Sequence, residues 1–212
     1  MNRIFIFSSG FGFTQKYWQF LAPRFQEDEI VYFEEHIPSS FGTDRNIEYI
    51  GIGHSLGFLK LVQSNINLKY LIGLNAFTHF LGKGHFLFKK RKREYDIFKA
   101  NFQNNPRLTM QKFYKNCGSA EYEENFNDLN IENLVKDLNL LESYIDINRN
   151  CPIMIVNSTD DNIVPEEITR DNFAANNNLT RCLLAHGGHM LGYRNSEEIF
   201  KLIKGFIECN TR

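Results

Sequence analysis

The chain has 212 residues, of which 42% are hydrophobic and 23% charged, and this balance is typical of one soluble globular domain with a single core. The formal net charge of −1 gives no overall field toward nucleic acid or a membrane surface. No run approaches the ~18 apolar residues of a membrane span, so no membrane span is expected.

Short apolar runs alternate with helical patterns along the chain. Residues 14–26 predict a helix with Thr14 as its N-cap, and the last helix is predicted after Asn195, which can form a capping box with Glu198. A further helix is predicted from the end of the third strand through Val62. The predicted strands are Ile4–Phe7, Ile30–Phe33, Tyr49–Gly53, Tyr70–Leu74, Pro152–Val156 and Cys182–Ala185.

This alternation predicts an α/β protein with a mostly parallel sheet of about six strands and helices on both faces. Residues 78–150 break the rhythm, because they contain no clear strand and several helical patterns, at 94–103, 107–116 and 129–142. We therefore predict a core formed by residues 1–77 and 151–212, with residues 78–150 as a helical lid insertion.

The four cysteines are far apart and show no CxxC pairing, which favours reduced thiols over a disulfide framework or a metal site. They are Cys117, Cys151, Cys182 and Cys209. The apolar run at the N-terminus is too short for the hydrophobic region of a signal peptide. We therefore expect a cytoplasmic protein.

One motif indicates a catalytic serine. The segment Gly53-His54-Ser55-Leu56-Gly57 matches G-x-S-x-G and lies between a strand pattern and a helix pattern. In such a motif the serine lies at a sharp turn, and the small residues around it let the turn close. The turn lifts the serine oxygen out of the sheet and places the next N–H, that of Leu56, at a helix N-terminus where it can stabilise an oxyanion. The alternative is a glycine-rich turn with a capping serine.

A catalytic serine needs a base, and the base needs a carboxylate that orients it. Asp160 and Asp161 follow the fifth predicted strand, and His186 and His189 follow the sixth. Open α/β sheets build their sites at these carboxyl ends of strands. An aspartate in a turn is usually a turn former, so the joint spacing of serine, acid and histidine is what favours catalysis.

Three segments together resemble the signatures of the α/β-hydrolase family, in the order found there: Gly53–Gly57, Asp161–Pro165 and Gly187–Met190. The resemblance implies the α/β-hydrolase fold, in a minimal version that begins at the first core strand. It covers nearly the whole chain and is weak only in residues 78–128.

The same resemblance implies a catalytic triad of Ser55, Asp161 and His189. Asp161 is preferred over Asp160 because the acid in that family lies four residues before the proline. His189 is preferred over His186 because two glycines precede it.

The second oxyanion donor in that family comes from the loop after the first core strand, which commonly reads His-Gly-x-Gly. Here the loop reads Ser9-Gly10-Phe11-Gly12, with Ser9 in place of the histidine. By position, the resemblance implies the backbone N–H of Phe11 as the donor beside that of Leu56.

Charge is segregated within residues 78–150, with an excess of cations up to residue 115 and an excess of acids from 119 onward. The run Lys89-Lys90-Arg91-Lys92-Arg93 has five consecutive cations. Either the two halves screen each other or form solvated helix faces, or the run is a docking patch for an acidic partner. Nucleic acid is disfavoured, because no recognised nucleic-acid module surrounds the run.

Within the same family, the insertion most resembles that of the pimeloyl-[acyl-carrier-protein] methyl ester esterases of biotin synthesis. The similar stretches are Tyr95–Phe98 running on through Pro106 to Phe113 and Tyr114, and Leu134–Leu141 leading toward Asp146. The resemblance implies a lid that docks an acidic acyl carrier protein bearing the substrate.

The leading prediction is a serine carboxylesterase that acts on an acyl ester through an acyl-enzyme and needs no cofactor. A general carboxylesterase or acyl thioesterase with the same triad is the second. The third, from another class, is a non-catalytic binding protein of the same fold, which the complete triad argues against. A metal-dependent enzyme is disfavoured, because no His, Cys and Asp spacing forms a set of metal ligands.

Overall fold

The computed structural model describes residues 2–33, 41–82, 84, 86–118, 122, 124–147, 149–176 and 179–211. Within them one sheet forms, in the strand order β2-β1-β3-β4-β5-β6, and every neighbouring pair is parallel. Its strands are β1 (Asn2–Ser8), β2 (Glu29–Tyr32), β3 (Ile47–His54), β4 (Leu68–Leu74), β5 (Ile153–Ser158) and β6 (Leu179–Leu184). Each predicted strand overlaps one of these, so the predicted parallel sheet is confirmed.

The strands β1, β4 and β5 are buried along almost their whole length, as expected for parallel strands that are covered on both faces. Alternate side chains of a strand point to opposite faces. On one face of β1, Phe5 packs on Phe25 with ring centroids 4.3 Å apart, and Phe7 packs on Trp18 at 5.0 Å. The sheet is therefore packed largely by aromatic side chains on this face.

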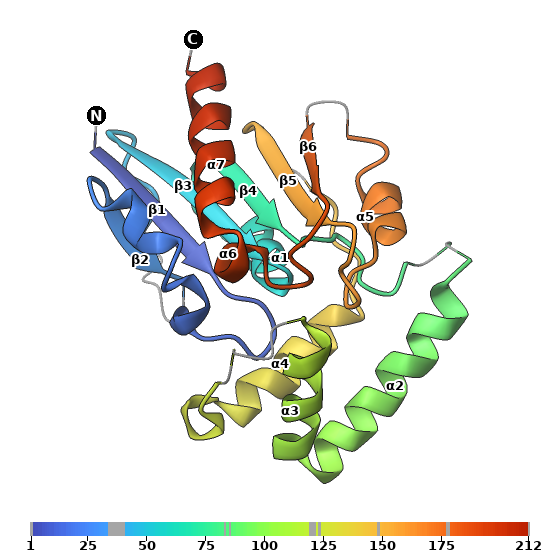
Figure 1. Cartoon of the computed structure of the whole chain (residues 1–212). Coiled ribbons are helices and arrows are strands. Elements are labelled where there is room, and N and C mark those ends of the chain that lie inside the picture. The colour runs from blue at the N-terminus through green and yellow to red at the C-terminus, as the bar shows by residue number, and fades with distance from the viewer. Residues whose placement is uncertain are drawn as a thin grey trace.

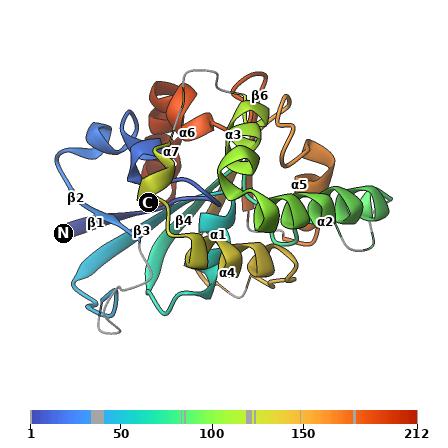
Figure 2. The ribbon, with the colours of Figure 1, turned by 90° about the horizontal axis from the view of Figure 1, so that it is seen from below.

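Helices cover both faces of the sheet, and Figure 2 shows α1 and α7 on opposite sides of it. On one face Phe58 packs on Phe173, with ring centroids 5.9 Å apart, and on the other Tyr70 packs on Phe206 at 6.0 Å. The first face carries α1 (Leu56–Gln63) and α5 (Glu166–Asn172). The second carries η1 (Gln15–Trp18), η2 (Ala22–Phe25), α6 (Leu191–Arg194) and α7 (Ser196–Asn210).

The single helix predicted for residues 14–26 is wrong, because this segment forms the two short 3₁₀ helices η1 and η2. Pro23 gives the reason, since proline has no N–H to donate and disfavours a helical conformation in the residue before it. The predicted cap is correct, because the Thr14 hydroxyl accepts a hydrogen bond from the N–H of Lys16 at 3.2 Å. The predicted apolar face is also buried: Tyr17, Trp18, Leu21 and Phe25.

The capping box predicted at Asn195 does not form. The N–H of Asn195 donates to Leu191 at 2.9 Å, so the chain passes from α6 almost directly into α7. The Asn195 carboxamide makes no cap, and its nitrogen lies 3.5 Å from the Glu198 carboxylate. An N-cap needs an extended backbone, and the preceding turn of helix removes it here.

Between β4 and β5 the chain forms α2 (Phe88–Asn104), α3 (Pro106–Asn116), η3 (Phe126–Asp128) and α4 (Ile131–Leu141). These helices lie beyond the carboxyl ends of the strands (Figure 1). The described part of residues 78–150 contains no strand, as predicted. No helix among the described residues is long and apolar enough to cross a membrane.

Arg149 fixes the return of this insertion to the core. Its guanidinium donates to the carbonyls of Leu61 at 2.7 Å, Val62 at 2.8 Å and Ile66 at 2.8 Å, and also to that of Ser64. The carbonyls of Leu61 and Val62 lie in the last turn of α1, where a helix leaves acceptors without partners, and those of Ser64 and Ile66 follow it. Arg149 therefore caps the helix whose other end begins at Ser55.

Candidate active site

Ser55 lies in the sharp turn between β3 and α1. Its backbone has φ 52° and ψ −121°, a strained conformation for a residue with a side chain. The flanking glycines are required by space: a Cβ on Gly57 would lie 2.0 Å from the carbonyl oxygen of Ser8, and one on Gly53 would lie 2.4 Å from the Cα of Phe58. The turn therefore closes only because these residues have no side chain.

Ser55, His189 and Asp161 form one continuous hydrogen-bonded chain. His189 Nε2 lies 3.0 Å from Ser55 Oγ, and His189 Nδ1 lies 2.8 Å from Asp161 Oδ2. A carboxylate only accepts, so Nδ1 carries the proton and Nε2 is free to accept that of the serine. The three residues are 5%, 1% and 5% exposed, respectively. The structure thus brings together all three residues of the predicted triad.

Asp161, rather than Asp160, faces the imidazole. Its Oδ1 accepts the N–H groups of Ile163 and Val164 at 2.8 and 2.9 Å. Asp160 instead accepts the N–H of Gly188 at 2.8 Å and the hydroxyl of Ser158. Partial burial raises the pKa of Asp160, but these two bonds, together with the backbone N–H groups of Gly187 and Asp160 itself, outweigh it and leave the pKa lowered. Asp160 therefore braces the histidine loop without touching the ring of the histidine.

The two candidate histidines lie in different environments. His186 is exposed and lies beyond the end of β6, which stops at Leu184. His189 is buried, and its backbone is held on both sides: its N–H donates to Cys117 at 3.0 Å, and its carbonyl accepts from His54 Nε2 at 2.9 Å. The backbone position of His189 is therefore fixed by two other segments.

The loop that carries Phe11 lies directly beside Ser55. It is a tight turn closed by the N–H of Phe13 to the carbonyl of Gly10 at 3.1 Å, with Gly12 at φ 73°. A Cβ on Gly10 would lie 3.0 Å from that of Ser55. The backbone N–H groups of Phe11 and Leu56 are thus carried by segments that border the serine, and their use as oxyanion donors stays a prediction.

Ser9, which replaces the histidine of the resembling loops, has a clear structural role. Its hydroxyl donates to the carbonyl of Thr14 at 3.1 Å and accepts from the Trp18 indole at 2.9 Å. These bonds tie the two ends of the loop together. The substitution therefore leaves the loop braced.

The insertion contacts the same loop. The hydroxyl of Tyr114 in α3 donates to the carbonyl of Gly12, and the Phe11 ring packs on Phe98 and Phe113 with centroids 5.8 and 5.7 Å apart. Glu124 accepts from the N–H and the hydroxyl of Thr14, both at 2.9 Å. One face of the site is therefore formed by the insertion.

Sequence reasoning missed two buried polar residues of the site, His54 and Asn75. His54 stacks on Tyr17 at 4.1 Å and 13°, and burial, aided by His189, lowers its pKa well below the usual value, so it is a neutral donor to the His189 carbonyl. Asn75 follows β4 and donates to Asp161 Oδ2 at 2.8 Å. A polar residue at the end of a strand, on the edge of the sheet that carries the acid and the histidine, was the signal for Asn75.

Cys117 is a second nucleophilic side chain close to the triad. It is fully buried, and burial raises the pKa of its thiol well above the usual value, with a further contribution from Asp161. The thiolate is the reactive form of cysteine. Burial therefore disfavours the thiolate form of Cys117.

The run Lys89–Arg93, for which a docking patch was one of two alternatives, does not form one continuous exposed surface. Arg91 is only 8% exposed, and its guanidinium donates to the carbonyls of Phe80 at 2.7 Å and Ile163 at 3.3 Å. A helix turns successive residues to different faces, so a run of like charges on α2 cannot all point to solvent. Arg91 instead ties α2 to the loop that carries Asp161.

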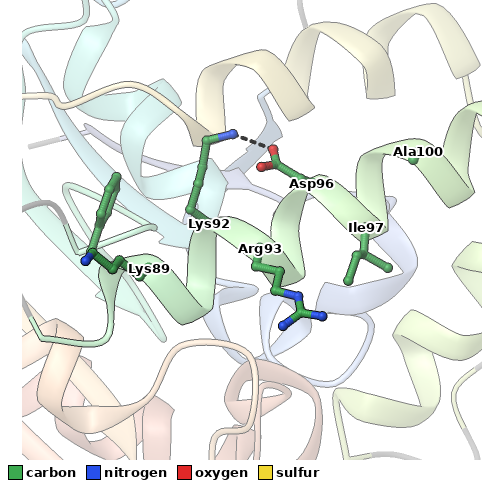
Figure 3. A pocket seen from close by; sticks show the side chains of 7 residues that line it. Lys89, Lys92, Arg93, Asp96, Ile97 and Ala100 are labelled. Carbon is green, nitrogen blue, oxygen red and sulfur yellow. Dashed lines mark hydrogen bonds and ion pairs between the residues drawn. The ribbon is translucent and has the colours of Figure 1, made fainter.

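Lys92 is engaged as well, by Asp96 and by Glu142 at 3.3 Å. Figure 3 shows Lys92 turned toward Asp96, while Arg93 and Ile97 lie on another side of α2. Lys89, Lys90 and Arg93 are exposed, and Lys90 pairs only loosely with Glu94, at 3.9 Å. Lys92 of the basic half of the insertion therefore pairs with Glu142 of the acidic half, as expected if the two halves screen each other.

No protein-family model and no curated protein sequence matches the chain. Solved structures do. A lipase-esterase related protein from Clostridium acetobutylicum has a TM-score of 0.72 at 17% identity, covering 96% of this chain and 94% of its own. An esterase from Exiguobacterium antarcticum has 0.75 at 13%, covering 98% and 92%. BioG from Haemophilus influenzae has 0.65 at 14%, covering 91% of each chain. The chain adopts the α/β-hydrolase fold, as predicted.

Proposed function

We propose that this protein is a serine hydrolase that cleaves a carboxylic ester, with Ser55 as nucleophile, His189 as general base and acid, and Asp161 as the carboxylate that orients it. The observation that carries the proposal is the unbroken chain from Ser55 Oγ through His189 to Asp161, at 3.0 and 2.8 Å. It begins at a serine in a strained turn, where strain is typical of function.

In this proposal His189 Nε2 takes the proton of Ser55 as Oγ attacks the carbonyl carbon. The carbonyl electron pair moves onto oxygen, which the N–H groups of Phe11 and Leu56 stabilise. The carbonyl reforms as the alcohol leaves with the proton from His189, and an acyl-enzyme remains. Water, deprotonated by His189, then attacks the acyl carbon. His189 returns this proton to Ser55 Oγ as Oγ leaves, which releases the acid and restores Ser55.

Several of the similar structures are named as hydrolases, but these names do not agree on which kind of bond is hydrolysed. An esterase and an epoxide hydrolase from Bacillus megaterium are among them, whereas a bromoperoxidase from Bacillus anthracis has a name that does not denote hydrolysis. The preference for an ester or thioester rests on the serine in the turn, because a serine paired with histidine is an acyl-transfer nucleophile. The same complete triad disfavours a purely binding role.

Hydrolysis of p-nitrophenyl acetate by the wild type and by Ser55→Ala tests the proposal. The kcat should fall on the order of 10⁶-fold, as for loss of a triad serine in a comparable hydrolase, with no change in fold by circular dichroism. Retention of a tenth of the wild-type turnover in Ser55→Ala would rule out the assignment.

The finer proposal is that the ester is carried by an acidic acyl carrier protein, with pimeloyl-[acyl-carrier-protein] methyl ester of biotin synthesis as the specific candidate. Its support is the resemblance of the insertion and the place of BioG among the similar structures. The cations available for docking on α2 are Lys89, Lys90 and Arg93, because Arg91 is buried. The cytoplasmic location remains part of this proposal.

A panel of substrates distinguishes the general esterase proposal from the carrier-protein proposal. It compares a free methyl ester, a free acyl thioester and the carrier-bound methyl ester, each with the wild type and with a triple variant, Lys89→Glu, Lys90→Glu and Arg93→Glu. Docking predicts a salt-sensitive loss on the carrier-bound ester alone, because exposed charges are screened within about 8–10 Å at physiological ionic strength. Equal losses on free and carrier-bound esters would remove the docking proposal and leave the esterase.

A further inference from the structure

Asn75, the residue that follows β4, contacts two loops of the site with one side chain. Its Nδ2 donates to Asp161 Oδ2 at 2.8 Å and to the carbonyl of Gly188 at 3.0 Å. Its backbone N–H donates to Val156 on β5 at 2.8 Å. The side chain is fully buried, with 0% exposure. Asn75 therefore joins the loop of the acid to the loop of the histidine from a fixed point on the sheet.

The oxygen of Asp161 that Asn75 contacts is the one that His189 uses. Oδ2 accepts from His189 Nδ1 and from Asn75 at 2.8 Å each, while Oδ1 accepts two backbone N–H groups. With two donors on each oxygen, the carboxylate cannot rotate without breaking a bond. The hydrogen bond from the Asn75 amide also partly neutralises the negative charge on Oδ2. The attraction between Oδ2 and a protonated imidazole of His189 is therefore weaker than it would be without Asn75.

Asn75 has an unusual backbone conformation and one unpaired polar atom. Its φ of 50° lies in the left-handed region, which few residues with a side chain adopt and which asparagine tolerates better than most. Its Oδ1 is buried without a hydrogen-bond partner in the described part of the chain. Strain and unpaired groups of this kind persist when the surroundings demand them and cluster at functional sites.

We infer that Asn75 is a positioning residue for the catalytic triad, which fixes the Asp161 carboxylate toward His189 and limits the charge that it presents there. The inference rests on the proposed function, since it assigns Asn75 a role in the same reaction. Two consequences follow from loss of the amide. The acid–base pair becomes less well oriented, which slows attack by Ser55. The carboxylate also stabilises the charged imidazolium more strongly, which moves the acidic limb of the pH–rate profile to higher pH.

The test is Asn75→Gly, because glycine adopts a φ of 50° without strain and the change removes only the side chain. The matched control is Asn157→Ala. Asn157 is also a buried asparagine, at the end of the neighbouring β5, but it donates to the Thr169 hydroxyl at 3.2 Å, away from the triad. The readout is the second-order rate constant for labelling of Ser55 by a fluorophosphonate between pH 5 and 9, with the melting temperature of each variant.

Asn75→Gly should label about 10- to 100-fold more slowly, the range that one hydrogen bond to a charged group represents, with its acidic limb displaced to higher pH. Asn157→Ala should lose stability but keep the wild-type rate and profile. If Asn75→Gly fails to fold, Asn75→Asp keeps the size and tolerates the positive φ, and its second carboxylate should displace the limb further in the same direction.

A wild-type rate and profile in Asn75→Gly, with only a lower melting temperature, would show a purely structural residue and overturn the inference. So would an Asn157→Ala variant that shifts the profile equally. A wild-type protein that is not labelled at all would overturn the proposed function itself, which is a different result.

Discussion

His189 is held by its backbone as well as by its ring. Its N–H bonds to Cys117 and its carbonyl to His54, while its ring spans Asp161 and Ser55. These contacts come from three separate segments of the chain, because His54 and Ser55 are neighbours in one turn. Fixed orientation is what allows a histidine to transfer a proton within a single turnover, so the choice of this histidine has a direct mutational test.

His189→Ala should reduce kcat for a p-nitrophenyl ester on the order of 10⁶-fold, whereas His186→Ala should change it less than twofold, because His186 is exposed beyond β6. Asp161→Asn should cause an intermediate loss, of about 10⁴-fold, since its role is to orient the imidazole. Steady-state kinetics on folded variants checks the order. If His186→Ala were the more damaging of the two histidine changes, the assignment of the base would be wrong.

Individual residues could be predicted from the sequence where catalysis requires a fixed order of residue types after successive strands. The serine turn, the acid and the histidine each follow a strand, and Asp161 and His189 come together as predicted. Asn75 could not be assigned, because its role depends on which donors reach Asp161 in space. Arg91 was misplaced, because a run of like charges does not reveal which residue of a helix turns inward.

α3 and the residue that follows it contact two loops of the candidate site. The Tyr114 hydroxyl donates to Gly12 in the loop beside Ser55, and the Cys117 carbonyl, at the end of the helix, accepts from His189 at 3.0 Å. A Cβ on Gly12 would lie 2.2 Å from the Met110 methyl group, so the helix packs tightly on that loop. Movement of α3 away from the core would therefore disturb the site.

Tyr114→Phe should lower kcat for a small ester about 3- to 10-fold with little change in KM, because it frees the loop that carries the Phe11 N–H and leaves the ring in place. Tyr95→Phe is the matched control. Tyr95 is buried to a similar extent, and its hydroxyl donates to the carbonyl of Leu138 in α4 at 2.7 Å, away from the triad. Equal kinetic effects of the two changes would argue that α3 only stabilises the fold.

Helices and strands could be predicted where apolar residues recur at a regular spacing without interruption. The strands and α3 and α4 appear close to their predicted positions. α2 begins at Phe88, earlier than predicted, because charged residues on its exposed faces hide the apolar period. In the segment of η1 and η2 the predicted apolar residues are buried, but a continuous α-helix does not form, because Pro23 interrupts the hydrogen bonding.

For the whole molecule, the alternation of strands and helices was enough to predict the parallel sheet. It could not show that the insertion contacts three of the loops around the candidate site. Arg91 bonds to Ile163 beside the acid, Cys117 to His189, and Tyr114 to Gly12. These contacts join segments far apart in sequence, so no local pattern records them. Residues of the insertion therefore contact the candidate site directly.

The buried His54 makes the stability of the whole fold depend on pH. Above about pH 6.5, the ordinary pKa of histidine, His54 is neutral in both folded and unfolded chains and has no effect. Below it, the unfolded chain binds a proton that the folded chain does not, because burial lowers the folded pKa. The free energy of unfolding should therefore fall as the pH falls, by up to about 1.4 kcal/mol per pH unit from this group.

Urea unfolding of the wild type and of His54→Gln between pH 7 and 5 measures this effect. The wild type should be the more stable at pH 7, and the difference should narrow toward pH 5, because glutamine does not titrate. A difference that stays constant, or widens as the pH falls, would mean that His54 is not held neutral in the fold.

The most direct test of the central claim is covalent labelling of the wild-type protein by a fluorophosphonate, followed by intact-mass measurement and peptide mapping. An activated serine reacts because its neighbouring base removes the proton, and an ordinary buried hydroxyl does not. If Ser55 is the nucleophile activated by His189, one probe should bind per chain, on Ser55, with labelling lost in Ser55→Ala and His189→Ala and kept in His186→Ala. Absence of labelling, or labelling on another residue that survives Ser55→Ala, would contradict it.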